Sequence, residues 1–282
     1  MARAVGSVMS THVPSILNAI IHHQEDEPYW KPFFDGYEPV HGWLDEVTPD
    51  VAVIFHNDHG MNFFLDKMPT FAIGCAPEYR HGDEGWGIPT VEPYPGDPSL
   101  SWHLVESLIA EGFDLTTCQE MSVDHAITNP MSLLWPNRAG ARVRIVPVTV
   151  NTVMFPFPSA TRCYALGEAI GRAIASYEAE GDLGVLLVGS GGLSHQLDGT
   201  RAGFINKDFD LRFVESLTDD PTWVTQFSGE DLVKEAGSQG VELLMWLAAR
   251  AAINGPVRRV AWNYHIPISN TAAGTLVLEP AA

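Results

Sequence analysis

The sequence predicts a single α/β domain, with a central, mostly buried β-sheet flanked by helices and an active site at the strand ends. Five short apolar runs have the length and composition of buried strands, and three longer segments between them have the length of helices. Strands that alternate with helices are typical of layered α/β folds. No fixed-period repeat or low-complexity segment divides the 282 residues, so we expect one domain over residues 1–282.

Each predicted element rests on its own pattern. The expected strands are AVGSVM from Ala4, VAVIF from Val51, VRIVPVTV from Val143, LGVLLVG from Leu183 and TLVLE from Thr275. The expected helices cover residues 100–112, 162–181 and 241–253, and Gly112 is a typical helix-ending glycine. The segment 75–98 is rich in glycine, proline and acidic residues, which predicts a long loop with a function.

The chain is strongly acidic, with 16 basic and 35 acidic residues and a formal net charge of -19. Such a charge argues against nucleic acid and against anionic membranes as partners. Three scattered cysteines cannot form a disulfide framework, and no apolar run approaches the roughly 20 residues that span a bilayer. Without a signal-like N-terminus either, the expected location is the cytoplasm. Phosphate-binding motifs such as GxGxxG are absent from the sequence.

Histidines stand where an α/β sheet places its ligands. His12, His59 and His195 each follow one of the predicted strands, and His125 follows a stretch of alternating apolar and polar residues. Ligands of open α/β sheets gather outside the carboxyl ends of the strands. We therefore treat these four histidines as candidates for one site.

Glu242 is unusual because it lies in the apolar run GVELLMWL. From composition alone, an exposed glutamate in the first turn of a helix is the favoured interpretation, and a metal ligand is the rarer one. Two imidazoles and one carboxylate leave half of an octahedral Fe(II) site open, but the same set also serves catalytic zinc. Spacing in the sequence does not choose between the two metals.

Taken together, the motifs resemble the class III extradiol dioxygenases, and among them the catalytic β subunits of protocatechuate 4,5-dioxygenases. The similar segments cover nearly the whole chain in the family's order: STHVP, FHNDHG, MPTFAIG, DEGWG, VDHA, GSGGLSHQL, RAGFINKDFD, GSQGVELLMWL and YHIPISNTA. Two departures are the FHNDHGMNFFLDKMPTF segment, which is closer to relatives that cleave catechol propionates, and Ala126, where a glycine is usual.

The resemblance implies a function for each candidate residue. It assigns His12, His59 and Glu242 as Fe(II) ligands, His195 as the acid–base residue and His125 as a second active-site histidine. It also assigns Ser269 and Asn270 to the carboxylate of the substrate. The implied reaction is extradiol cleavage of a catecholic aromatic acid by O2, with protocatechuate and its product 4-carboxy-2-hydroxymuconate semialdehyde as the first expectation.

Alternatives remain open at this point. Gallate, 3-O-methylgallate or another substituted catechol are alternative substrates. A zinc-dependent hydrolase with the same ligands, or a binding module without activity, are rival functions. The resemblance further implies a small helical α subunit as a partner. Because the sequence stops at Ala282, soon after the SNT segment, we expect this subunit to be a separate chain or the protein to form an oligomer.

Overall fold

The computed structural model describes residues 1–136 and 143–281, and it confirms the predicted α/β class. An eight-stranded sheet runs in the order β10-β11-β1-β9-β2-β8-β3-β6. Its strands are β1 (Ala2–Ser10), β2 (Val51–His56), β3 (Phe71–Gly74), β6 (Thr116–Cys118), β8 (Arg144–Val150), β9 (Leu183–Ser190), β10 (Val257–Ile268) and β11 (Thr271–Pro280). The four central strands β1, β9, β2 and β8 are parallel to one another, so their carboxyl ends share one edge.

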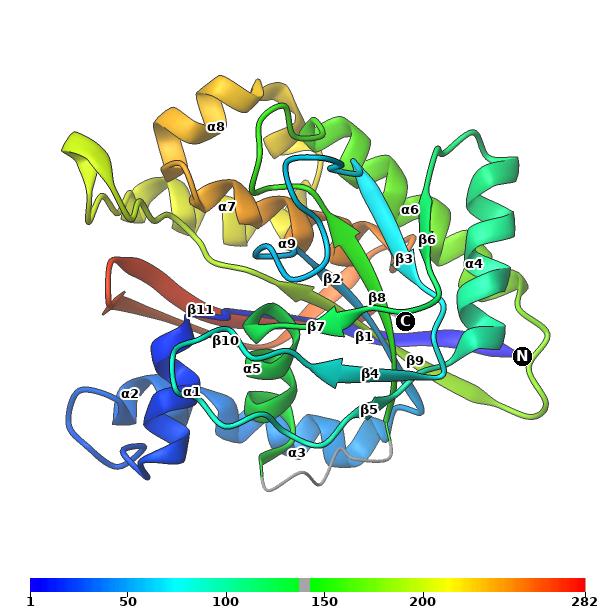
Figure 1. Cartoon of the computed structure of the whole chain (residues 1–282), viewed down its shortest axis with the longest axis horizontal. Helices are drawn as coiled ribbons and strands as arrows, with labels where there is room; N and C mark the ends of the chain where they lie inside the picture. The colour runs from blue at the N-terminus through cyan, green and yellow to red at the C-terminus, as the bar shows by residue number, and fades with distance from the viewer. Residues whose placement is uncertain (137–142, 282) are drawn as a thin grey trace.

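Helices cover both faces of this sheet (Figure 1). Helices α4 (Pro98–Ala110), α6 (Ala160–Ser176), α7 (Lys207–Asp219), α8 (Gly229–Ala236) and α9 (Leu243–Ala251) pack on one face. Helices α1 (Pro14–Ile21), α2 (Lys31–Phe34), α3 (Glu38–Val47) and α5 (His125–Leu134) pack on the other. Short 3₁₀ turns are η1 (Asp35–Tyr37), η3 (Gly199–Arg201), η4 (Trp223–Gln226) and η5 (Gly240–Glu242). No helix in the described ranges is long and apolar enough to cross a membrane.

Strand β2 shows why the central runs are apolar without interruption. Val51, Val53 and Phe55 face the cluster under α6 and α9, whereas Ala52 and Ile54 face the cluster under α3 and α5. Side chains alternate between the two faces of a strand, so a strand covered on both faces needs apolar residues at every position. The uninterrupted apolar run in the sequence therefore indicates a buried central strand.

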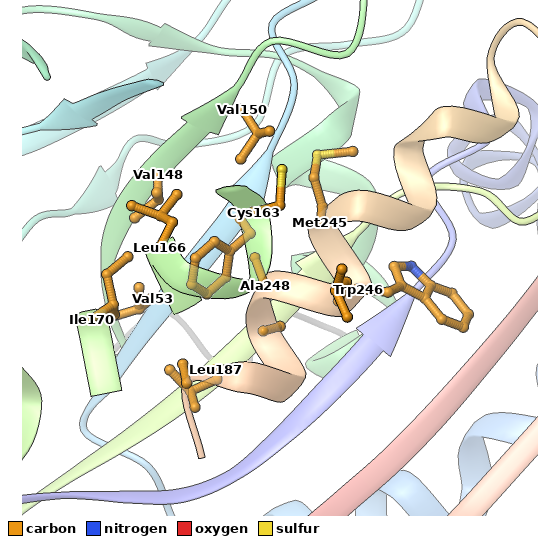
Figure 2. Packing of buried hydrophobic residues seen from close by; sticks show 14 of the residues in the cluster. Val53, Val148, Val150, Cys163, Leu166, Ile170, Leu187, Met245, Trp246 and Ala248 are labelled. Atoms are coloured by element: carbon orange, nitrogen blue, oxygen red, sulfur yellow. The ribbon is translucent and has the colours of Figure 1, made fainter. Parts of the chain in front are cut away.

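Helix α9 is the element that fixes one side of the site, and small residues let it lie deep in the core. A Cβ atom added to Gly167 or Gly171 of α6 would lie 2.2 Å from a backbone oxygen of the α9 region, that of Ala248 or Ala252. A Cβ at Gly189 of β9 would lie 2.8 Å from the Cα of Trp246. Figure 2 shows this packing, with Met245, Trp246 and Ala248 of α9 among the side chains of the core.

Predicted and observed elements agree in the centre and differ at the periphery. All five predicted strands are present, and the three predicted helices correspond to α4, α6 and α9. Helix α6 ends at Ser176, earlier than expected, because Tyr177 adopts an extended backbone and its ring packs against His103, with 5.1 Å between centroids. Strands β3, β6 and β10 were not predicted.

The segment 75–98 is not the continuous loop that its composition predicts. It contains β4 (Glu78–His81) and β5 (Tyr94–Pro95), which form a three-stranded sheet in the order β5-β4-β7 with β7 (Ser122–Val123). Strand β4 runs parallel to β7, with His81 paired to Val123. Such short strands leave little periodicity to detect, and turn-forming residues dominate the segment. The remaining loop, between β4 and β5, lies beside the histidines of the candidate site.

Candidate active site

The candidate site lies at the carboxyl edge of the parallel strands, as the sequence predicts. His12 follows β1 by two residues, His59 follows β2 by three, and His195 follows β9 by five. Glu242 ends the 3₁₀ turn η5 directly before α9. Four segments that are far apart in the sequence therefore meet at one place because parallel strands end at the same edge.

The carboxylate of Glu242 is the centre of this cluster. It is buried, with 5% of the residue exposed, so the exposed position that composition alone favours is wrong. Its Oε2 lies 3.2 Å from Nε2 of His12 and 3.7 Å from Nε2 of His195, and its Oε1 lies 3.7 Å from Nε2 of His59. The backbone N–H of Gly192 donates to Oε2 at 2.9 Å, which compensates part of the desolvation.

His12 directs its Nε2 atom at this carboxylate. Its Nδ1 lies 2.8 Å from Oγ of Ser190, and that hydroxyl donates its own proton to the backbone oxygen of Ala126. Ser190 therefore accepts a hydrogen bond from Nδ1 of His12. In the neutral ring, Nε2 is then unprotonated and faces an anionic oxygen.

His59 is held in the same way by Asp124. The backbone N–H of His59 donates to Oδ2 of Asp124 at 2.8 Å, and Nδ1 lies 3.2 Å from the same oxygen. Although burial opposes ionisation of Asp124, its hydrogen bond to His59 and the charge of that ring hold the Asp124 pKa far below its usual range. The Nε2 of His59 is thus the nitrogen left to face Glu242.

The arrangement fits a bound cation. Two imidazole lone pairs converge on one buried carboxylate, which is repulsive unless a proton or a metal ion lies between them. Burial alone would lower the pKa of His59, yet Asp124 and Glu242 raise it to about 10, so a positive charge is strongly favoured there. One ring nitrogen from each of His12, His59 and His125 lies within 4.8 Å of the others. The residues present therefore fit a metal: the Nε2 atoms of His12 and His59 lie beside the Glu242 carboxylate, and a ring nitrogen of His125 is near those of both histidines.

Asn57 adds an amide between two of these donors. Its Nδ2 donates to Oε1 of Glu242 at 3.0 Å and lies 3.1 Å from Nε2 of His59. The side chain is buried, and its Oδ1 has no hydrogen-bond partner among the residues that the structure describes. Buried polar atoms are rarely unsatisfied, so a water molecule or ligand is the expected partner of this oxygen.

His195 is a buried imidazole beside the cluster. Its Nδ1 lies 2.9 Å from the backbone oxygen of Leu193, which can only accept, so Nδ1 carries the proton and Nε2 is free. Burial lowers the pKa of His195, although the charge of Glu242 opposes this. Gly237 packs so closely that a Cβ atom there would lie 2.1 Å from the backbone oxygen of His195. The loop around His195 is thus fixed, and its ring is a neutral base.

His125 lies at the first turn of α5, whose N-cap is Asp124. Its ring stacks on that of His59 with 4.0 Å between centroids and lies 5.2 Å from the ring of His12. Burial, followed by the positive charge of His59, lowers the pKa of His125 to about 4. The structure therefore brings His125 together with His12 and His59, although its sequence context gave only a weak signal.

Ser269 and Asn270 occupy a different environment. Both are exposed and form the turn between β10 and β11, where Ser269 has a positive φ of 53°. The hydroxyl of Ser269 lies 3.3 Å from that of Ser15. The next residue, Thr271, forms an isolated β-bridge with His195, so the turn adjoins the histidine cluster at its exposed side.

Several supporting residues were not singled out from the sequence. They are Asn57, Asp58, Glu84, Asp124 and Ser190. Asp58 shapes the His59 loop, since one of its oxygens accepts from four backbone N–H groups, those of residues 60 to 63. The signal available was local: Asn57, Asp58 and Asp124 each lie within two residues of a candidate histidine in HNDH or VDH. Acidic neighbours of a metal-binding histidine commonly orient its ring.

The fold and the site define a known family. The chain belongs to the LigB family, described as the catalytic LigB subunit of aromatic ring-opening dioxygenase, whose model matches residues 6–274. This membership confirms the resemblance predicted from the motifs.

Individual relatives differ in length and similarity. The chain is 38% identical to gallate dioxygenase of Pseudomonas putida over 197 residues, which are 70% of this chain but 57% of that protein. The chain thus spans little more than half the length of this relative. It is 28% identical to 2,3-dihydroxyphenylpropionate/2,3-dihydroxicinnamic acid 1,2-dioxygenase of Rhodococcus jostii over 284 residues, 85% of this chain and 87% of that protein. The crystal structure of an uncharacterized protein from Escherichia coli K12 has the same fold, with a TM-score of 0.58, 14% identity and coverage of 98% and 100%.

Proposed function

We propose that this chain is the catalytic part of a non-haem Fe(II) extradiol dioxygenase, which opens the ring of a catecholic aromatic acid with O2. The observation that carries the proposal is the convergence of the Nε2 atoms of His12 and His59 on the Glu242 carboxylate. Two imidazoles and a carboxylate with open positions are the ligand set of non-haem Fe(II) oxygenases. Membership of a ring-opening dioxygenase family supports the same reaction.

The metal would be held by His12, His59 and Glu242. Bound Fe(II) supplies the Lewis acidity that lowers the pKa of catechol hydroxyls, together with the electron exchange that activates O2. The protein contributes the orientation of the donors, because Ser190 and Asp124 hold each imidazole through Nδ1 and keep Nε2 available.

Proton transfer is assigned to His195 and His125, the two histidines of the site that are not proposed as ligands. In this proposal, Nε2 of His195 accepts a hydroxyl proton from the substrate and later donates a proton to a reacting oxygen. His125, whose ring stacks on that of His59, serves as a second acceptor. Both rings are buried and neutral, and burial makes the protonated forms strong acids.

For the substrate, we place gallate and other substituted catechols ahead of protocatechuate. The relatives described above are named for gallate and for 2,3-dihydroxyphenylpropionate, and both compounds are catecholic acids. Ser269 and Asn270, in the exposed turn beside Thr271, would hold the substrate carboxylate. A strongly acidic chain needs such local donors to bind an anion.

A partner chain is expected to cover the apolar side chains that are exposed around the carboxyl edge of the sheet. Large apolar side chains are exposed on loops that follow the carboxyl ends of β2, β8 and β9: Phe64 (54%), Leu65 (83%), Phe155 (71%) and Leu197 (56%). Exposed apolar groups around a functional edge are typical of interaction sites. We infer that a small helical α subunit, or a second copy of this chain, covers them. Size-exclusion chromatography of the chain alone and with a candidate α subunit tests this point.

Oxygen consumption tests the proposed reaction. Iron-reconstituted protein should consume O2 with at least one of gallate, 3-O-methylgallate, 2,3-dihydroxyphenylpropionate, protocatechuate and catechol. His12→Ala should abolish consumption, whereas His22→Ala, which removes an exposed histidine, should not. A zinc-loaded protein that hydrolyses a substrate without O2 would establish the rival hydrolase instead. No reaction with any catechol, with metal bound, would refute the proposal.

A further inference from the structure

Glu84 is a partly buried carboxylate that has no role in the proposed reaction as described above. It lies in the loop after β4, and the parallel pairing of His81 with Val123 brings this loop alongside the start of α5. The backbone N–H of Gly82 donates to the oxygen of Val123 at 2.9 Å and extends the pairing by one step. Glu84 therefore arrives beside His125, only 12% of its side chain being exposed.

Both oxygens of Glu84 are directed at His125. The backbone N–H of His125 donates to Oε1 at 2.9 Å, and Nδ1 of the ring lies 2.5 Å from Oε2. Although burial opposes it, the hydrogen bond to His125 lowers the pKa of Glu84 to about 2, so this group is a carboxylate at neutral pH. A carboxylate only accepts hydrogen bonds, which requires the proton of the neutral ring to lie on Nδ1.

A second histidine, His81, lies near Glu84. The backbone N–H of Val91 donates to Nδ1 of His81 at 3.1 Å, so the proton of that neutral ring lies on Nε2. This Nε2 is 3.9 Å from Oε1 of Glu84. This separation is too long for a hydrogen bond, so His125 is the histidine that orients the carboxylate, and His81 is only its neighbour.

The same loop also covers the ring of His125. Gly85 and Gly87 have φ values of 78° and 71°, a conformation that other residues rarely adopt, and they flank Trp86. The turn they permit places the Trp86 ring 5.1 Å from the His125 ring. Glu84 and Trp86 therefore approach one imidazole from a single short segment.

We propose that Glu84 is the positioning residue of His125, which fixes the tautomer protonated on Nδ1 and leaves Nε2 as the only basic nitrogen of the ring. This proposal rests on the proposed function, in which His125 accepts a substrate proton. In that step the O–H bond of a hydroxyl breaks, its electron pair stays on oxygen, and an N–H bond forms at Nε2. The Nδ1 proton stays on His125, and the unchanged charge of Glu84 stabilises the imidazolium.

Nitrogen NMR of ¹⁵N-histidine-labelled, metal-free full-length protein tests the tautomer directly. His125→Gln identifies the His125 signals by their disappearance. In the wild type, these signals should show Nδ1 as protonated and Nε2 as unprotonated. In Glu84→Ala, protonation of Nε2 should appear, because the acceptor that selects Nδ1 has gone. Retention of the pure Nδ1–H form in Glu84→Ala would overturn the proposal.

Kinetics of the iron-loaded enzyme give the second readout. Glu84→Ala should lower kcat by about 10–100-fold, the usual cost of losing such an outer partner, while the KM changes little. Glu84→Gln has the same length and can accept only one of the two His125 donors, so its kcat should lie between those of Glu84→Ala and the wild type. If Glu84→Ala does not fold, Glu84→Gln alone decides, and wild-type tautomer and kcat in it would refute the proposal.

Asp83→Asn is the matched control. It removes a charge from the adjacent position, but its side-chain oxygen can still accept from the N–H of Gly85, as Asp83 does at 2.9 Å. Wild-type tautomer and kcat are expected, and a loss equal to that of Glu84→Ala would assign the effect to the loop instead of to Glu84. A wild-type enzyme that cleaves no catechol refutes the proposed function but leaves the tautomer measurable, so the two failures are distinguishable.

Discussion

Nε2 of His12 lies 3.2 Å from Oε2 of Glu242, and neither atom carries a proton when the ring is neutral. Ser190 accepts a hydrogen bond from Nδ1, the protonated nitrogen of the neutral ring, so the Nε2 lone pair and a carboxylate oxygen face each other in a buried place. Coulomb repulsion between such groups grows as the local dielectric constant falls. A cation between these two atoms would relieve this repulsion and is therefore favoured by the folded chain.

Removal of Glu242 should remove the metal. Glu242→Ala is expected to lower Fe(II) affinity by more than about 100-fold, because the loss of even an outer partner of a ligand costs about 10–100-fold. Metal analysis after dialysis measures this, and Fe(II) should raise the Tm of the wild type but not of the variant. Glu111→Ala is the control, since its carboxylate forms a surface ion pair with Arg172. Normal iron content in Glu242→Ala would exclude Glu242 as a ligand.

His195 should matter for turnover and not for metal binding. His195→Ala is expected to retain Fe(II) and to lower kcat by about 10²–10⁴-fold, the usual range for a lost general acid–base group. The loop should keep its shape because Gly237 and the hydrogen bond from His195 N–H to the oxygen of Ala236 (2.8 Å) act on the backbone. Iron content and single-turnover rates separate the two effects. A variant without iron would make His195 a ligand.

The sequence was sufficient for the parts of the molecule that are determined by local pattern. Strands such as β2 are covered on both faces, so apolar residues fill every position and the pattern is strong. Strand β10 lies at the edge of the sheet, and its exposed positions carry Arg258, Arg259 and Trp262. An edge strand with one solvated face has no continuous apolar run, which explains why it was not predicted.

The candidate site shows the same division. The positions of His12, His59 and His195 after strands follow from topology, which the pattern reveals. The burial of Glu242 does not follow from topology. It depends on the position of η5 directly before α9, and Gly167 and Gly189 permit that helix to pack closely in the core. Only the resemblance to a family pointed to Glu242. Contacts between distant segments, such as Glu84 with His125, have no signature in a single sequence.

Substitution of Ser269 or Asn270 should raise the KM for carboxylated substrates more than the KM for neutral catechols. Asn270→Ala is expected to raise the KM for carboxylated substrates by about 10-fold or more, since a hydrogen bond to a charged group contributes about 1.5–3 kcal/mol. The KM for catechol should change little, and Ser269→Ala should behave in the same direction. Ser15→Ala is the control, because it removes only the hydroxyl that lies 3.3 Å from that of Ser269. Equal effects on catechol and on the acids would remove the proposed role.

Asp210 should make the stability of the protein depend on pH. It is fully buried in α7, where it accepts from the N–H and hydroxyl of Ser194 (2.8 and 2.6 Å) and from the hydroxyl of Tyr264 (2.9 Å). Burial outweighs these hydrogen bonds and raises its pKa from 3.8 to about 6. The folded state therefore binds the Asp210 proton more tightly than the unfolded state does.

Because the folded pKa is the higher one, the protonated form stabilises the fold fully below about pH 3.8, and this contribution is lost as the pH rises through about 6. The total is roughly 3 kcal/mol, of which about 1 kcal/mol falls between about pH 5 and pH 7.5. Urea unfolding of metal-free protein measures it as the difference between wild type and Asp210→Asn, which should decrease by this amount as the pH rises. Asp208→Asn, which removes an exposed carboxylate from the same helix, should keep the wild-type pH dependence. A difference that stays constant, or that grows with pH, would show that Asp210 is already ionised in the folded state throughout this range.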